Sequence, residues 1–407
     1  MSEKKTKRSV WQFPWSYIES FFIAVGLMLV GFILEYFSGG TITQLPSYPV
    51  NLFLLLAFVS YLLLTQIFVK GPVMNWLSSV PAAMAVMTVF TFLILLMGFI
   101  PQGEPKGFGG KIGLNHIHTS KPYIIIAVFM LTVLGYTIIR RMRQKLSLKN
   151  FAFFLNHGGL FIILAAASLG SSDLLRLKMP VIQGQYSDIA FPNQTHQAKM
   201  PFGIHLKSFS IEEYPPELLI FDAKDGYPII EKGSKLPFIE EGKTGNILGF
   251  DFEIVSFISY AIPMGEGYVY TEQFGSTHAA LVRISKGNIT TEDWISCGNF
   301  MFQPRYIILD QHHVLGMASP KTKRYVSVVD IERDGKIVTE NAEISVNNTL
   351  KEGQWKIYQF SYDSELGRWS QMSIFEVIRD PWLPVVYIGI FMVLLGSVYL
   401  VWVGRRL

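Results

Sequence analysis

Cysteine is almost absent from this chain: Cys297 is the only one among 407 residues. A single thiol excludes an internal disulfide, a CxxC redox pair, a cysteine-based zinc cluster and a CxxCH haem attachment site. The GxxxxGK[ST], GxGxxG, HExxH and GxSxG strings are also missing, so common nucleotide-binding, zincin and hydrolase signatures are not present. We expect Cys297 itself to be buried and inert.

Charge is scarce as well. Only 16% of the residues are charged and 50% are hydrophobic, whereas a soluble domain carries about 25% charged residues. Six stretches are long and apolar enough to cross a membrane, and none contains Lys or Arg. These predicted spans are about 17–37, 51–69, 81–100, 122–139, 151–170 and 383–403.

The short segments that flank the predicted spans differ in positive charge. Twelve Lys and Arg residues lie on the side that holds both termini, and three lie in the short loops of the opposite side. Positively charged flanks stay in the cytoplasm. The sequence therefore predicts a multi-pass protein of the cytoplasmic (inner) membrane with both termini cytoplasmic and residues 171–382 exported.

The exported region is predicted to be one β-rich domain. It has 27 Asp and Glu against 20 Lys and Arg, and this acidity argues against a nucleic-acid partner. Alternating or β-branched patterns predict strands at 202–210, 250–257, 279–284 and 325–331, and Asp334-Gly335 predicts a hairpin turn. A sandwich or barrel of antiparallel strands is the expected fold.

The predicted fold class is thus a polytopic α-helical membrane protein with a large exported β-rich domain inserted before the last span. The expected domains are a five-span bundle (1–170), the exported domain (171–382) and a C-terminal span with a basic tail (383–407).

Ionisable side chains inside a span are costly and are functional candidates by default. Glu19 and Glu35 lie at the two ends of the first predicted span, where both can reach interfacial water, so we expect them to be solvated. His157 is the only histidine in a predicted span, about 9 Å below its cytoplasmic edge. A structural histidine would bond to a backbone carbonyl, whereas a functional one would relay protons or bind the metal of a macrocycle.

The neighbours of His157 are small. Gly158 and Gly159 remove side chains beside it, which admits either another helix or a flat ligand. Asn156 points about 100° away from His157 on an ideal helix, so we do not assign it to the imidazole.

A second histidine pair, His116 and His118, precedes Pro122 on the predicted outer face. Such a pair can bind a metal but is more often part of a solvated loop. The remaining histidines lie in the exported region without the spacing of metal ligands: His196, His205, His278, His312 and His313.

Several stretches together resemble the ResB/CcsB family of System II cytochrome c biogenesis. They are Asn156-His157-Gly158-Gly159-Leu160, the run 170–178, Gln183-Gly184-Gln185, Tyr362-Asp363, the run 367–370 and the run 375–384. The order of spans, exported domain and final span is also similar. In the commoner family layout three spans precede the exported domain, whereas five are predicted here. The histidine-bearing span is still the last before that domain.

The resemblance implies a function in moving haem. It implies that His157 is an axial ligand of haem b, which is transported and not covalently attached, and the motif carries this role to no other residue. Asn156, Gly158 and Gly159 adjoin His157 and are weaker candidates for the lining of the haem site. His116 and His118 are weaker ligand candidates, because the resembling pathway places the outer haem ligands on the partner protein. The implied partners are a CcsA/ResC-type tryptophan-rich haem-handling protein, apocytochrome c, thioredoxin-like thiol reductants and membrane lipid. The chain would then be a subunit of a cytochrome c synthase complex, with no complete catalytic site of its own. A membrane receptor or a transport accessory protein with an exported ligand-binding domain is the alternative.

Overall fold

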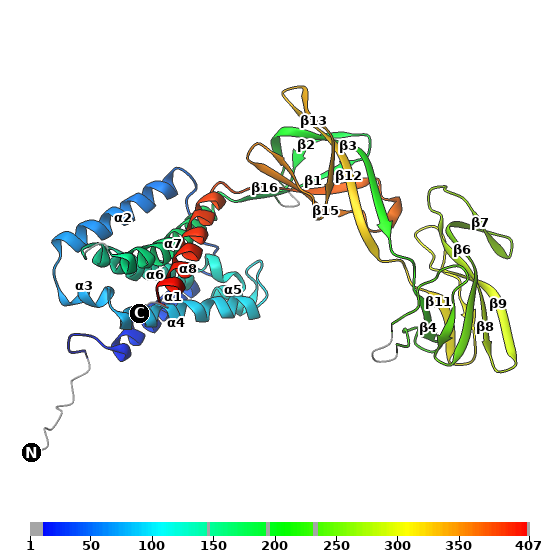
Figure 1. Ribbon diagram of the computed structural model, residues 1–407, viewed down its shortest axis with the longest axis horizontal. Coiled ribbons are helices and arrows are strands. Elements are labelled where there is room, and N and C mark those ends of the chain that lie inside the picture. The colour runs from blue at the N-terminus through cyan, green and yellow to red at the C-terminus, as the bar shows by residue number, and fades with distance from the viewer. Residues whose placement is uncertain (1–10, 145–146, 193–195, 231–234, 405–407) are drawn as a thin grey trace, which may run out of the picture. The chain divides into compact units, whose positions relative to one another are not determined.

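A computed structural model describes residues 11–144, 147–192, 196–230 and 235–404 (Figure 1). The chain divides into two compact units. One comprises Met1–Leu174 with Arg379–Leu407, and the other comprises Leu175–Ile378. We call them the membrane unit and the β unit. Each has its own buried hydrophobic clusters.

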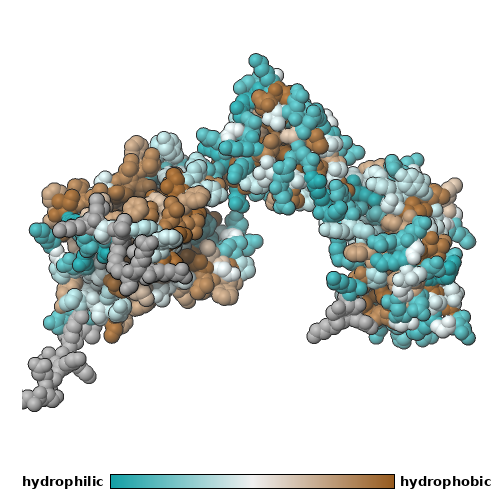
Figure 2. Space-filling model, viewed as in Figure 1, coloured by the Kyte–Doolittle hydropathy of each residue, from teal (hydrophilic) through white to brown (hydrophobic). Residues whose placement is uncertain are grey.

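The membrane unit is helical. Its elements are α1 (Tyr17–Phe37), α2 (Val50–Phe68), α3 (Pro72–Leu77), α4 (Val80–Phe99), α5 (Gly107–Lys111), the 3₁₀ turn η1 (Leu114–Thr119), α6 (Lys121–Met142), α7 (Leu148–Gly170) and α8 (Leu383–Gly404). Six helices in the described residues are long and apolar enough to cross a membrane, as expected from the hydropathy. Large apolar side chains remain exposed on them, such as Phe37, Phe68 and Phe99, and the surface of this unit is correspondingly brown in Figure 2. An apolar surface of this extent fits contact with lipid.

Glycines set the contact between α7 and α8. A Cβ atom added to Gly159 would lie 2.7 Å from the Gly389 carbonyl oxygen, and one added to Gly389 would lie 2.7 Å from the Gly159 carbonyl oxygen. Asn156 fills the space beside Gly396 and accepts a hydrogen bond from the Ser397 hydroxyl at 3.0 Å. The two backbones approach closely because neither helix has a side chain at the crossing point.

The β unit holds all the strands of the described structure. They are β1 (Leu175–Ile182), β2 (Tyr186–Ala190), β3 (Ala198–Glu213), β4 (Leu218–Asp222), β5 (Thr244–Ile247), β6 (Phe250–Met264), β7 (Gly267–Tyr270), β8 (Thr277–Lys286), β9 (Ile289–Ser296), β10 (Ile307–Ile308), β11 (His313–Met317), β12 (Thr322–Arg333), β13 (Lys336–Ser345), β14 (Leu350–Glu352), β15 (Trp355–Tyr362) and β16 (Met372–Arg379), with a 3₁₀ turn η2 (Gly367–Trp369) before β16. The predicted strands are confirmed, because each lies within β3, β6, β8 or β12.

Two large hydrophobic cores and one small cluster form in the β unit, where the sequence predicted one sandwich or barrel. Sheets β1-β16-β15-β14 and β13-β12-β3-β2 enclose the first core, which includes Phe202 and Phe375. Sheets β10-β11-β4 and β5-β6-β8-β9 enclose the second, which includes Ile254 and Leu315. Strand patterns report the burial of each face, but they do not report which sheets share a core, so the division was not predictable from them.

The hairpin predicted at Asp334-Gly335 is confirmed. Arg333 of β12 pairs with Lys336 of β13 across a two-residue loop. Asp334 and Gly335 have φ values of 51° and 73°. Positive φ at both central positions is the backbone of a type I′ turn, whose twist matches that of the flanking strands.

Candidate functional site

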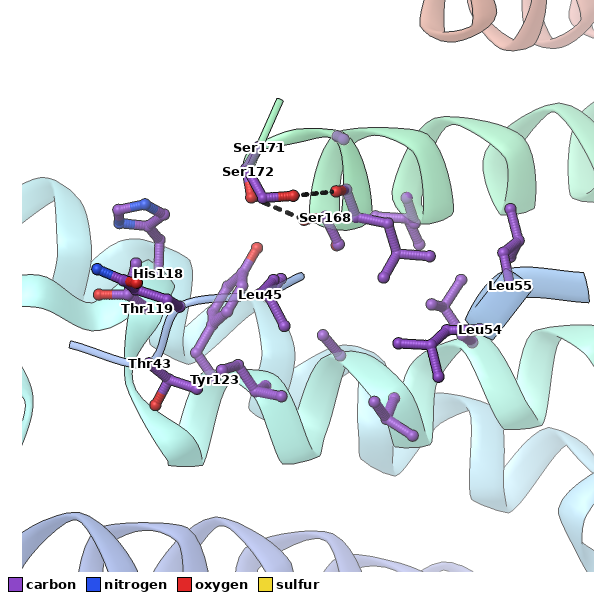
Figure 3. Close-up of a pocket in the computed structure, with 18 of the residues that line it drawn as sticks. Thr43, Leu45, Leu54, Leu55, His118, Thr119, Tyr123, Ser168, Ser171 and Ser172 are labelled. Carbon is purple, nitrogen blue, oxygen red and sulfur yellow. Dashed lines mark hydrogen bonds between the residues drawn. The ribbon is translucent and has the colours of Figure 1, made fainter. Parts of the chain in front are cut away.

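A cavity of about 660 Å³ lies in the membrane unit between α2, α6, α7 and residues 42–47. Its walls are mostly aliphatic side chains. Figure 3 shows Thr43, His118, Thr119 and Tyr123 at one end of the cavity, and Leu54 and Leu55 at the other. Ser168, Ser171 and Ser172 at the end of α7, together with Gln44 and Ser47, complete the polar part of the lining. A pocket of this size, mainly apolar with a few convergent polar groups, is typical of a small-molecule or cofactor site.

The two histidines of η1 have different surroundings. His118 is exposed and lines the cavity, whereas His116 is buried with only 4% of its surface exposed. They therefore do not form a common ligand pair. Among the described residues, no group of three or more His, Cys, Asp or Glu side chains could hold a metal ion.

Glu35 holds η1 against the start of α6. Its side chain has no exposed surface and accepts a hydrogen bond from the Lys121 backbone N–H at 2.8 Å. It lies 3.2 Å from His116 Nε2 and 3.4 Å from Lys121 Nζ. A carboxylate at a helix N-terminus is also favoured by the helix dipole. Glu35 thus fixes the segment that carries His118.

The expected solvated role of the two span-end glutamates is wrong. Glu19 has only 4% of its surface exposed, and its carboxylate accepts a hydrogen bond from the Ser16 backbone N–H at 2.9 Å. This is a helix-capping arrangement at the start of α1. Both glutamates bind protein donors of the chain instead of interfacial water, because each lies beside unpaired donors at a helix start.

His157 lies on α7 and is half-buried. Its Nδ1 is 3.2 Å from the Phe153 carbonyl oxygen, and its ring stacks on that of Phe153 at 3.8 Å. A nitrogen that faces a carbonyl oxygen carries the proton, so Nε2 keeps the lone pair. A neutral imidazole with Nε2 free of its proton is the form that binds a metal.

The face of α7 that carries His157 is also the face that lines the cavity. At 3.6 residues per turn, Leu164 and Ser168 lie within about 20° of His157, about 10 Å and 16 Å further along the helix. Both line the cavity, but His157 does not. Phe161 lies between His157 and Leu164 in the helix and packs near Gly135 of α6. A Cβ atom added to Gly135 would be 3.4 Å from the Phe161 ring and 2.6 Å from Leu62 Cδ1.

Asn156 and Gly159 lie at the contact of α7 with α8, turned away from the face that carries His157. Gly159 is about 160° from His157 around the helix. Gly158 lies beside the contact, where an added Cβ atom would be 3.6 Å from Met392 Cε. The close neighbour of Gly159 in the structure is therefore another helix, α8.

Asp173 joins three segments next to the cavity, a role that the sequence did not indicate. Its carboxylate accepts hydrogen bonds from the Tyr48 backbone N–H at 2.8 Å, the Asn51 amide at 2.7 Å and the Trp382 indole at 2.6 Å. Burial raises the pKa of this carboxyl group. The three hydrogen bonds and the positive charge of Arg379 lower the pKa by more than burial raises it, so the pKa lies below its ordinary value. The carboxylate form is thus the form that holds the segments together.

Replacing Asp173 by asparagine is expected to lower the stability of the membrane unit by about 1–3 kcal/mol at pH 7. A depressed pKa stabilises the fold above the ordinary carboxyl pKa of about 4, and that contribution is lost as the pH falls through the folded-state value. The melting temperatures of the wild type and Asp173→Asn, followed by helical circular dichroism in detergent, should therefore differ at pH 7 and converge below about pH 4. Glu104→Gln, on an exposed loop of the same unit, is the control. A constant difference across this range would contradict the prediction.

The thiol in the β unit is not arranged for reaction. Cys297 is partly buried, and its Sγ lies 3.5 Å from the Thr277 hydroxyl. Burial raises the pKa of this thiol, which reduces the thiolate fraction on which reactivity depends.

No protein-family model matches this chain, and no curated protein is significantly similar to it.

Proposed function

We propose that this chain is the haem-handling B subunit of a System II cytochrome c biogenesis complex. In this proposal haem b is cargo that crosses the cytoplasmic membrane and is delivered to apocytochrome c. A CcsA/ResC-type tryptophan-rich membrane protein and thioredoxin-like reductants would be the partners, because this chain has scattered tryptophans and a single cysteine. The short ResB/CcsB-like stretches in the sequence support the family part of the proposal.

The observation that carries the proposal is a row of features along one face of α7. His157 is at one end of the face, and the cavity with His118 is at the other. Haem is flat and largely apolar, with charged propionates at one edge, so the cavity suits it in both respects. The aliphatic walls would contact the macrocycle, and the hydroxyl groups of Tyr123, Ser171 and Ser172 would receive the propionates.

Each histidine would have its own role in this transfer. With both termini cytoplasmic, His157 lies in the inner half of the membrane and would bind haem that arrives from the cytoplasm. His118, at the end of α6 and α7 nearest the exported domain, would bind it after the crossing. Glu35 acts through His116 and Lys121 and would hold η1 so that His118 faces the cavity.

A haemin titration of the purified full-length protein tests the cavity. His118→Ala is expected to weaken haemin binding at least about tenfold, because a lost ligand should matter no less than a lost outer-shell partner. Added imidazole should restore the Soret band of this variant, since the cavity is large enough to admit it. The exposed His312 of the β unit provides the control variant His312→Ala. Equal haemin binding by the wild type, His118→Ala and His312→Ala would show that His118 is not a haem ligand.

A deletion strain tests the function as a whole. Loss of holocytochrome c with unchanged apocytochrome c synthesis is expected, and complementation by the wild-type chain should restore it. Normal holocytochrome c in the deletion strain would refute the proposal.

A further inference from the structure

A second hollow, of about 630 Å³, lies within the β unit. The end of β3, the following Tyr214, Pro215 and Pro216, and parts of β6, β8, β12 and η2 form its walls. We call it the glutamate groove, because four glutamates line it: Glu212, Glu213, Glu240 and Glu241. It is separate from the membrane cavity and shares no residue with it.

The lining of the glutamate groove has an excess of negative charge. Its two cationic residues each face one glutamate: Lys323 lies 3.5 Å from Glu212, and Arg368 lies 3.5 Å from Glu213. The other two glutamates, Glu240 and Glu241, have no cation of the groove wall beside them. A cationic ligand would balance them.

Glu240 and Glu241 are the glutamates in excess, and both are exposed. Glu240 is 3.7 Å from Lys243, a partly exposed lysine that does not line the groove, and ion pairs at the surface contribute little to stability. Glu241 accepts a hydrogen bond from the Phe257 backbone N–H at 3.3 Å. A side chain, not a neighbouring strand, thus satisfies this backbone donor of β6.

His278 supplies an independent sign of a missing donor. Its side chain is only 9% exposed, and its Nε2 lies 3.0 Å from a Glu213 carboxylate oxygen. Burial lowers the pKa of His278 more than the bond to Glu213 raises it, which favours the neutral ring. Nε2 therefore carries the proton, and Nδ1 is an acceptor. Within the described structure Nδ1 has no hydrogen-bond partner, and an N–H donor would complete it.

Aromatic rings line the groove beside these acceptors. The Arg368 guanidinium already lies 4.3 Å above the Tyr260 ring, and Phe257 stacks on His278. Such faces accept both a cationic head and the methylene stem of a long basic side chain.

We propose that the glutamate groove binds an extended peptide segment through a lysine or arginine side chain, whose cationic head lies between Glu240 and Glu241. The groove volume of about 630 Å³ exceeds that of one side chain, which favours a peptide over a small free amine. This inference does not depend on haem.

The test uses the full-length protein in detergent and a fluorescein-labelled pentapeptide with two lysines, followed by fluorescence anisotropy. The double variant Glu240→Gln/Glu241→Gln should bind the peptide at least about tenfold more weakly than the wild type. The matched control Glu340→Gln/Glu365→Gln removes the same charge from exposed positions outside the groove, and it should bind within about twofold of the wild type. A peptide with glutamates in place of the lysines should not bind.

Three results would overturn the inference. They are no binding by the wild type, equal weakening in the two double variants, and displacement of the peptide by spermidine at concentrations far below those of unlabelled peptide. Haemin binding by Glu240→Gln/Glu241→Gln should equal that of the wild type, so failure of this inference and failure of the haem proposal are distinguishable.

Discussion

Replacing His157 by alanine is expected to remove most of the haem Soret band from the complex purified with the proposed CcsA/ResC-type partner. The Nδ1 contact with the Phe153 carbonyl leaves Nε2 as the metal-binding nitrogen, and alanine has no substitute for it. We expect at least about a tenfold loss of haem affinity. The measurement is an absorption spectrum of the wild-type and His157→Ala complexes at equal protein concentration.

The controls separate loss of the ligand from loss of the fold. His157 is half-buried and faces away from the contact between α7 and α8, so His157→Ala should still assemble with the partner. Pull-down of the partner checks this, and His312→Ala serves as the histidine control. An unchanged Soret band in the His157→Ala complex would indicate that the partner, and not His157, binds the haem. No band in either complex would favour a receptor with an exported ligand-binding domain.

Replacing Gly159 by alanine is expected to destabilise the membrane unit by about 1–3 kcal/mol, because the added methyl group meets backbone. Its Cβ atom would lie 2.7 Å from the Gly389 carbonyl oxygen and 2.9 Å from Met392 Cβ, so the helices must separate. Thermal unfolding in detergent, followed by helical circular dichroism, should show a lower melting temperature for Gly159→Ala.

The adjacent glycine is the matched control. A Cβ atom on Gly158 would be 3.6 Å from Met392 Cε, which is ordinary contact, and alanine has the higher helix propensity. Gly158→Ala should therefore be as stable as the wild type or slightly more stable. Equal melting temperatures for the two variants would contradict the packing role. Weaker haem binding by Gly159→Ala without a change in melting temperature would instead indicate that Gly159 lines the haem site.

Features that depend on local sequence were predictable. A run of about 20 apolar residues identifies a span wherever it packs, and Asp334-Gly335 defines its turn by its own backbone preferences. The separation of His157 from Gly159 around α7 also follows from helical geometry alone. The sequence did not show which element packs against each face of α7. The structure places α8, from the C-terminal end of the chain, against the face that carries Gly159.

Features that depend on tertiary packing could not be predicted. The burial of Glu35 requires His116 and Lys121, which are more than 80 residues away in the chain. The cavity brings together α2, α6 and α7, whose serine and tyrosine side chains look like ordinary interfacial residues in the sequence. The three hydrogen-bond donors to Asp173 come from segments that no local sequence pattern connects to it.

The close contact of α7 with α8 also bears on how the chain accommodates its β unit. The polypeptide leaves the bundle at Gly170 and returns at Trp382, and a Cβ atom on Gly170 would lie 2.5 Å from the Trp382 side chain. The point where the chain leaves the helical bundle and the point where it returns are therefore held close together within the membrane unit. The entropy of closing a loop between two fixed points grows only with the logarithm of its length, by about 0.6 kcal/mol per doubling. An insert at this position can thus lengthen, shorten or be exchanged as a cassette at small cost to the helices that carry it.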